Sequence, residues 1–191
     1  VVGLSTGTTD DAWAKRIEVG TPSPSSRIKA LHALQDAGIA TYAMLCPVFP
    51  HMLVGNELED LIGAVRPDRV EHLWIEPYND RENAAMVMAA MEPGSIDRSY
   101  LKRIYEEKEP KVWSQYATNL YVRTKEMAQK GGYLHKLRYL LYERMIDKRD
   151  AYQFAGFEGV LLQDSPRADG FSMNPAIAAL QAACEIQSRS F

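Results

Sequence analysis

The sequence predicts an α/β protein: a partial (β/α) barrel half with parallel strands, followed by a mainly helical C-terminal segment. Three observations support this class. Apolar runs alternate with amphipathic helical runs along the first part of the chain, the loops between them are short, and the apolar runs are almost uninterrupted. Continuous apolar strands that alternate with helices are typical of parallel sheets whose two faces are both covered.

We expect three strands in the first part of the chain, at Val1–Ser5, Ile39–Cys46 and Val70–Ile75. Each is rich in apolar residues, and each ends at loop-forming or polar residues. A parallel strand can follow its neighbour only through a crossover, and such crossovers are right-handed in almost all proteins. The three strands are therefore expected to lie side by side, with helices between them.

The expected helices have clear start and stop signals. Asp10 can cap a helix over 11–18, and Ser23 can cap a second helix that begins with Pro24 and ends at Gly38. A third helix is expected over 57–65, where Pro67 closes it. Strand, helix, strand, helix and strand thus follow one another in the chain.

Two regions are expected: 1–82 as the C-terminal half of a barrel, and 83–191 as a mainly α-helical region. From 83 to about 150 the pattern is helical, one more strand is expected at Gly159–Gln163, and a last helix at 174–186. Three strands cannot close a barrel and would leave an open edge. We therefore expect the missing N-terminal half of the barrel, before the first residue, as the structural partner of this chain.

The composition excludes several classes of protein. The chain has 191 residues, 46% of them hydrophobic, and a formal net charge of -3. It has no apolar run of about 18 residues and no signal-peptide pattern, so we expect a cytoplasmic protein that does not bind a membrane. Cys46 and Cys184 are far apart, which argues against a disulfide framework and against a metal cluster held by thiolates.

A set of short motifs between residues 2 and 81 is typical of one enzyme family. The motifs are Leu4-Ser5-Thr6, Arg16-Ile17-Glu18, Gly20-Thr21-Pro22-Ser23-Pro24 with Arg27-Ile28 and Ala30-Leu31, Ala37-Gly38-Ile39, Pro47-Val48-Phe49-Pro50, and Trp74-Ile75-Glu76-Pro77 with Asn79 and Arg81. Together they resemble the later barrel strands of radical SAM proteins, above all the spore photoproduct lyase-like branch. Val19 stands where that pattern has a proline.

The resemblance implies that S-adenosylmethionine binds at the C-terminal ends of the strands. It also implies a 4Fe-4S cluster, held in the family by a CxxxCxxC loop after the first strand of the whole barrel. The full-length protein would cleave S-adenosylmethionine reductively to a radical that abstracts hydrogen from an unknown substrate. The cysteine loop is absent here, so we expect neither cofactor on this chain alone and no activity from it alone.

The resemblance and the rule that barrel enzymes act at the C-terminal ends of their strands single out six cofactor-binding candidates. They are Ser5, Thr6, Arg27, Cys46, Glu76 and Asn79. By resemblance, Ser5 lies near the ribose or methionine part of the ligand; the alternative is that Ser5 and Thr6 only form a turn. The guanidinium of Arg27 can bind the carboxylate of S-adenosylmethionine through two parallel hydrogen bonds, and an ion pair with Glu18 is the alternative.

The second and third strands offer further candidates with structural alternatives. Cys46 and the two residues before it would contact the adenine, or else belong to the core, with Cys46 an inert thiol. His72, Trp74 and Glu76 alternate along one face, which either lines the barrel or meets the outer helices. Glu76, Asn79 and Arg81 are expected to form a polar cluster at the barrel mouth. The spacing of the histidines predicts no metal site.

The segment 98–150 suggests a different function. Lys and Arg outnumber Asp and Glu there, and several tyrosines and a tryptophan lie among them. Aromatic and basic side chains together can bind nucleic acid, so a non-catalytic module that binds nucleic acid or a protein is the alternative function. A solvated helical face whose tyrosines pack inward is the other interpretation, and we favour it.

Overall fold

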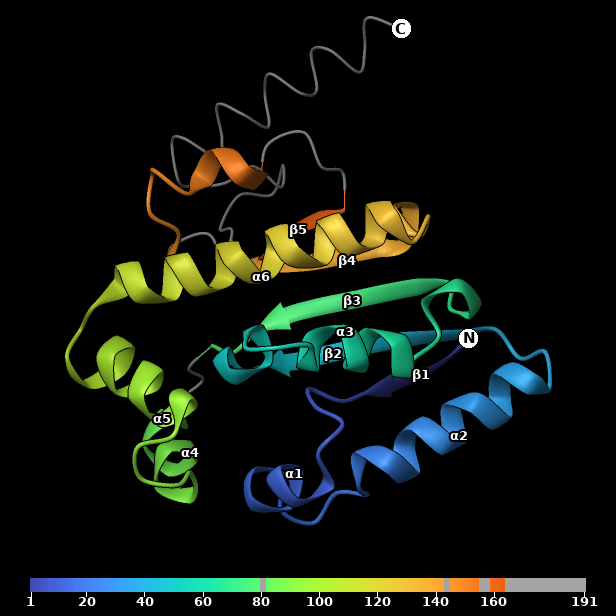
Figure 1. Ribbon diagram of the computed structural model, residues 1–191, viewed down its shortest axis with the longest axis horizontal. Helices are drawn as coiled ribbons and strands as arrows, with labels where there is room; N and C mark the ends of the chain where they lie inside the picture. The colour runs from blue at the N-terminus through green and yellow to red at the C-terminus, as the bar shows by residue number, and fades with distance from the viewer. Residues whose placement is uncertain (80–81, 143–144, 155–158, 164–191) are drawn as a thin grey trace, which may run out of the picture.

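Five parallel strands form one sheet, whose order in space follows their order in the chain (Figure 1). The structure, a computed structural model, describes residues 1–79, 82–142, 145–154 and 159–163. The strands are β1 (Val2–Ser5), β2 (Thr41–Val48), β3 (His72–Pro77), β4 (Leu137–Tyr142) and β5 (Val160–Gln163). The predicted α/β class with parallel strands is confirmed.

Six α-helices accompany this sheet in the described part of the chain. They are α1 (Asp11–Ile17), α2 (Pro24–Asp36), α3 (Glu57–Ala64), α4 (Ala84–Ala90), α5 (Ile96–Leu101) and α6 (Pro110–Lys130). Short turns extend them, among them the 3₁₀ turn η1 (Pro50–Leu53) and the π-helical turn η3 (Lys102–Glu106). When consecutive parallel strands lie in sequential order, right-handed crossovers place their helices on one face, as in part of a barrel.

The predicted helix starts are confirmed by their caps. The Asp10 carboxylate accepts hydrogen bonds from the backbone N–H groups of Ala12 (2.8 Å) and Trp13 (3.0 Å). The Ser23 hydroxyl accepts one from the N–H of Ser26, and Pro24 occupies the first turn of α2. These side chains pair N–H groups that a helix start would otherwise leave without a partner.

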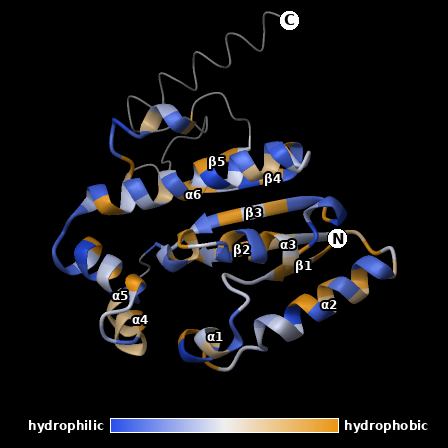
Figure 2. Cartoon of the chain, viewed as in Figure 1, coloured by the Kyte–Doolittle hydropathy of each residue, from blue (hydrophilic) through white to orange (hydrophobic). Residues whose placement is uncertain are grey.

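The register of the strands separates the two faces of the sheet. One row of paired residues is buried in the main core and comprises Leu4, Ala43, Leu73 and Leu137. The next row lies on the opposite face, is exposed or half-buried, and comprises Ser5, Met44, Trp74 and Arg138. Figure 2 shows that β3 is apolar in its middle and polar toward its carboxyl end.

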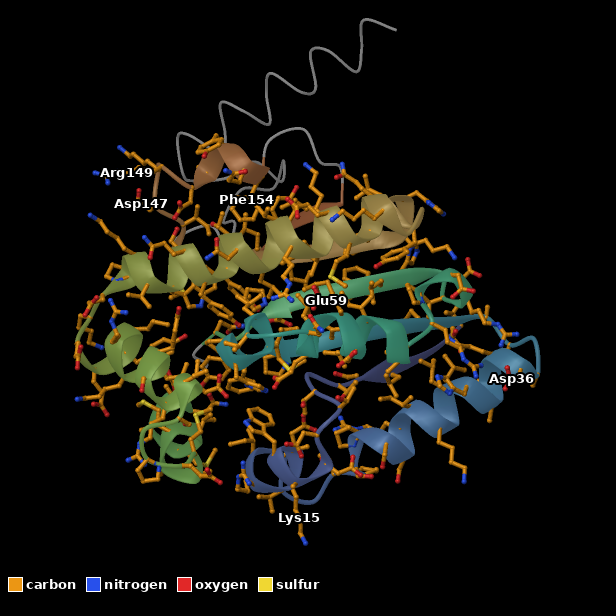
Figure 3. The ribbon with its side chains drawn as sticks, viewed as in Figure 1. Lys15, Asp36, Glu59, Asp147, Arg149 and Phe154 are labelled. Atoms are coloured by element: carbon orange, nitrogen blue, oxygen red, sulfur yellow. The ribbon has the colours of Figure 1, made fainter. Side chains whose placement is uncertain are left out.

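The core face is covered mainly by α3 and α6, which a half-buried ion pair joins. The guanidinium of Arg123 on α6 donates through Nε to Glu59 on α3 at 2.8 Å and through Nη1 to the carbonyl of Leu53 at 2.9 Å. Figure 3 shows Glu59 between these two helices. Over the described ranges, even α6, with 21 residues, does not combine the length and apolar character that a membrane-spanning helix requires.

The described residues between 83 and 163 are mainly helical, but Leu137–Tyr142 is a strand where a helix was expected. This strand pairs with β3 and β5, so strands from both sides of residue 82 share the sheet. The expected strand at Gly159–Gln163 is confirmed as β5. The expected helix at 174–186 and Cys184 lie outside the described residues.

Gly7 provides a test of this packing. A Cβ atom at Gly7 would lie 1.9 Å from the backbone oxygen of Pro47, whereas one at Gly63 in α3 would meet nothing within 4 Å. We expect Gly7→Ala to lower the free energy of unfolding by about 1–3 kcal/mol, because the backbone at the end of β2 cannot move aside cheaply. Gly63→Ala is the control and should raise it by roughly 0.5–1 kcal/mol. Urea unfolding followed by circular dichroism measures the free energy of unfolding of both variants. Equal effects of the two substitutions would contradict the close approach of Gly7 to the backbone of Pro47.

Candidate functional site

The carboxyl ends of β2, β3 and β4 meet at the side chain of Glu76, which is 5% exposed. The thiol of Cys46 on β2 donates to Glu76 Oε2 at 2.7 Å. The Asn79 amide donates to Oε1 at 3.0 Å, and the hydroxyl of Tyr142 on β4 donates to the same oxygen. Three of the predicted site residues, Cys46, Glu76 and Asn79, are therefore brought together, and we call them with Tyr142 the Glu76 cluster.

Tyr142 is the member of the Glu76 cluster that the sequence did not predict. It lies on β4, inside the segment that was expected to be helical. A signal was present in the run Leu-Arg-Tyr-Leu-Leu-Tyr, which is rich in aromatic and apolar residues and follows Gly131-Gly132. Such a run between turn residues indicates a buried strand as readily as a helix.

Ser5 lies beside this cluster at the end of β1. Its side chain is exposed, and its hydroxyl donates a long hydrogen bond, 3.4 Å, to the backbone oxygen of Cys46. Arg27 reaches the same place from α2: Nη1 donates to the backbone oxygen of Ser5 at 2.7 Å, and Nη2 to Glu18 at 2.6 Å. The alternative ion pair of Arg27 with Glu18 is therefore present, and it fixes the end of β1 to the loop before α2.

Thr6, the next residue along the chain, is turned into its own loop. Its side chain is fully buried, and its hydroxyl donates to the backbone oxygen of Thr8 at 2.7 Å. The turn proposed as the alternative for this position is thus formed by Thr6, while Ser5 remains at the surface. Arg81, expected in the same polar cluster as Glu76, lies outside the described residues.

The open face of the sheet carries aromatic side chains that lead to the Glu76 cluster. Leu73 and Ile75 are fully buried in the core, so the alternating residues His72, Trp74 and Glu76 point to the other face. The His72 and Trp74 rings meet edge to face with centroids 6.4 Å apart. On the same face, Met44 is half-buried, and the expected adenine contact from β2 reduces to Met44 and Cys46, since Leu45 is core.

From the core side, α6 holds the strand ends in place. The Tyr116 hydroxyl donates to the backbone oxygen of Val48 and accepts from the N–H of Tyr78 at 2.8 Å. The Trp113 indole donates to the backbone oxygen of Tyr78 at 2.7 Å. Burial raises the pKa of Tyr116 well above its ordinary value of 10, and nearby Asp97 and other acidic groups add to this rise. The phenol therefore remains a hydrogen-bond donor at any physiological pH.

Two of the histidines, His32 and His51, make structural contacts. The Nε2 of His32 lies 2.7 Å from the backbone oxygen of Ala64, and His51 lies against Asp97. Among the residues that the structure describes, no group of three or more His, Cys, Asp or Glu side chains could hold a metal ion. The Glu76 cluster itself offers one thiol and one carboxylate, which suit hydrogen bonding to an organic ligand better than metal binding.

The basic segment packs its aromatic side chains inward. Trp113, Tyr116, Tyr121 and Tyr139 are at most 2% exposed, so they cannot stack on nucleic-acid bases. Two of the basic residues are paired within the segment: Lys102 with Glu107 at 3.3 Å, and Arg103 with Glu109 at 2.8 Å. For these residues the structure has the inward packing that we favoured.

Comparison with known proteins gives distant relatives without a described function. A stretch of 65 residues is 31% identical to an uncharacterized protein of Mycobacterium tuberculosis strain H37Rv, and to uncharacterized proteins of M. tuberculosis strain CDC 1551 and Mycobacterium bovis. The match covers 34% of this chain and spans 19% of the length of each relative. The chain matches neither a known protein-family model nor a solved structure.

Asp11 gives the loop beside Arg27 a pH dependence that can be measured. The Ser25 hydroxyl and backbone N–H both donate to its carboxylate, at 2.5 and 2.9 Å, and they lower the pKa of Asp11 from its ordinary value of 3.8. A carboxylate whose pKa is lowered on folding stabilises the folded state above its unfolded pKa, and this contribution is lost as the pH falls through the folded pKa.

We therefore expect Asp11→Asn to flatten the decrease of stability between about pH 5 and pH 2. Urea unfolding at a series of pH values measures this slope, with Asp60→Asn, a change to an exposed carboxylate on α3, as the matched control. A slope that the two variants change equally would show that the Ser25 contacts do not form in solution.

Proposed function

We propose that the carboxyl edge of this sheet binds S-adenosylmethionine, as the later part of a barrel of the radical SAM type within a larger enzyme. The whole enzyme would abstract hydrogen from an unknown substrate. The observation that carries the proposal is the meeting of Ser5, Cys46, Glu76 and Asn79 at one edge of sequentially ordered parallel strands. The resemblance of residues 2–81 to that family points to the same edge.

The side chains at this edge match the polar groups of S-adenosylmethionine. The ligand has ribose hydroxyls, an amine and a carboxylate, which need both donors and acceptors. Ser5 can donate and accept, Glu76 can accept from a hydroxyl or an amine, and Asn79 can do both. Half-buried Met44 and Trp74 on the open face supply apolar surface for a planar adenine.

The described residues do not fit the 4Fe-4S cluster. A cluster of this type needs several thiolates, and Cys46 is the one cysteine in the described part of the chain. When bound at such a cluster elsewhere in the whole enzyme, S-adenosylmethionine would supply the radical that attacks the substrate. We assign to this chain only the binding and orientation of the ligand.

Within that role, each member of the Glu76 cluster has a separate task. Glu76 accepts hydrogen bonds from the ligand, while Asn79 and Tyr142 keep its carboxylate in one orientation. A carboxylate that is already fixed in one orientation before the ligand arrives loses less conformational entropy on binding, and this raises the affinity.

Calorimetric titration tests the proposal. The sequence alone predicted no cofactor on this chain, but the assembled strand ends lead us to expect that it binds S-adenosylmethionine and its stable analogue S-adenosylhomocysteine. Glu76→Gln should weaken the binding of both about tenfold, because a hydrogen bond to a charged acceptor is lost. Glu71→Gln is the matched control, since Glu71 is exposed just before β3, at the amino edge of the sheet.

The control variant should bind as the unchanged chain does. Saturable binding that Glu76→Gln leaves unaltered would place the ligand elsewhere and contradict the proposed site. An absence of binding to the chain and to the whole enzyme that contains it would contradict the proposed ligand.

A further inference from the structure

The helices α4 and α5 lie beyond the carboxyl ends of the strands, next to the tips of β2 and β3 (Figure 1). Their buried apolar side chains do not join the main core. They form a second cluster with Phe49 and Tyr78, which follow β2 and β3, and its α4 and α5 members are Ala84, Val87, Met88, Met91 and Leu101. Trp13 and Ile17 of α1 and Tyr105 of η3 also pack against this cluster. We call residues 83–101, which pack on the edge of the sheet outside the main core, the α4–α5 cover.

Backbone irregularities mark both ends of the α4–α5 cover. Glu82, just before it, has a φ of 68°, a left-handed conformation that a side chain with a Cβ rarely adopts. Just after it, η3 is a π-helical turn, a geometry that proteins use in single turns and often at functional sites. Ile104 within η3 belongs to the main core, so the chain is fixed again directly after the cover.

Asp97 fastens the cover to the sheet. Its side chain is 3% exposed although it is charged, and Oδ1 accepts a hydrogen bond of 2.8 Å from the backbone N–H of His51 in η1. Oδ2 is 2.7 Å from Nδ1 of the His51 ring, at an angle outside hydrogen-bond geometry. A buried carboxylate is costly without a donor, so Asp97 favours the docked position of the cover.

Two further polar contacts of the cover lie nearer the surface. The Tyr78 hydroxyl donates to Asn83 Oδ1 at 2.9 Å, and Arg16 on α1 lies 3.5 Å from the largely exposed Glu92. Exposed ion pairs of this kind contribute little. The cover is therefore held mainly by Asp97 and by the packing of its apolar side chains on Phe49 and Tyr78, whose rings stack on each other with centroids 4.8 Å apart.

The cover also lies close to the Glu76 cluster. Tyr116 binds the backbone of Val48 at the end of β2 and of Tyr78 just after β3, so one side chain holds both strand ends beside the residues on which the cover packs. Phe49 and Tyr78, on which the cover packs, follow Cys46 and Glu76 by three and two residues. A displacement of the cover would therefore uncover Phe49 and Tyr78, directly past the Glu76 cluster.

We propose that residues 83–101 form a hinged cover, latched by Asp97, that opens to admit a ligand to the carboxyl edge and closes over it. The identity of that ligand rests on the proposed function, whereas opening is a property of the free chain. When a segment of this kind opens, the change in backbone dihedral angles is usually confined to a few residues at the ends of helices or loops. Here Glu82 and the turn η3 would be the hinges.

Hydrogen-deuterium exchange followed by mass spectrometry tests the cover in the free chain. We expect amides of 83–101 to exchange together and faster than those of β2 and β3. Asp97→Ala should speed their exchange about tenfold, because the latch is a hydrogen bond to a charged group, and leave the strands unchanged. Glu126→Ala, which removes an exposed carboxylate from α6, is the charge-matched control and should alter neither.

Exchange of 83–101 no faster than that of β2 and β3, or a uniform increase over the sheet in Asp97→Ala, would overturn the cover. A milder variant, Asp97→Asn, keeps an acceptor for the His51 N–H and should give an intermediate exchange rate in 83–101. Such a graded effect distinguishes loss of the latch from misfolding of the Asp97→Ala variant. Adding S-adenosylmethionine should slow exchange in 83–101. If the free cover opens but this ligand has no effect, the proposed ligand is wrong and the cover stands.

Discussion

The carboxylate of Glu76 joins the carboxyl ends of three neighbouring strands. It accepts hydrogen bonds from Cys46 on β2 and Tyr142 on β4, and from Asn79 in the loop after its own strand. A carboxylate with 5% exposure is tolerated only where such donors surround it. The carboxyl ends of β2, β3 and β4 must therefore lie next to one another at one edge of the sheet. This also fixes where the loops that follow these strands begin.

The same strand ends are fixed a second time from the helical side. Tyr116 and Trp113 on α6 bind the backbone of Val48 and Tyr78, directly past the Glu76 cluster. Hydrogen bonds from both the Glu76 cluster and α6 therefore leave these loops little freedom. The α4–α5 cover lacks this double support, because it meets the edge through the small cluster around Phe49 and through Asp97.

The sequence contained enough information for the parallel strands and for most of the site. Runs ending at Ser5, Cys46 and Glu76 predicted strand tips at one edge, since parallel strands share their direction. It did not predict Tyr142, because the choice between helix and strand for Leu137–Tyr142 is made by pairing with β3, a contact distant in sequence.

Contacts between distant residues also explain the other differences. Nothing local distinguishes Thr6, which turns into its own loop, from Ser5, which stays at the surface. The bond between Asp97 and His51 joins residues 46 positions apart, and neither lies in a motif. The pair of Glu18 and Arg27 was foreseeable because both flank one loop.

A double-mutant cycle on Glu76 and Tyr142 tests the central claim most directly. Urea unfolding of the unchanged chain, Glu76→Gln, Tyr142→Phe and the double variant gives the coupling free energy of the two side chains. If the carboxylate joins β3 to β4 as described, the coupling should be about 0.5–3 kcal/mol. Effects that add within about 0.3 kcal/mol would show that the two side chains do not meet, and the account of the site would fail.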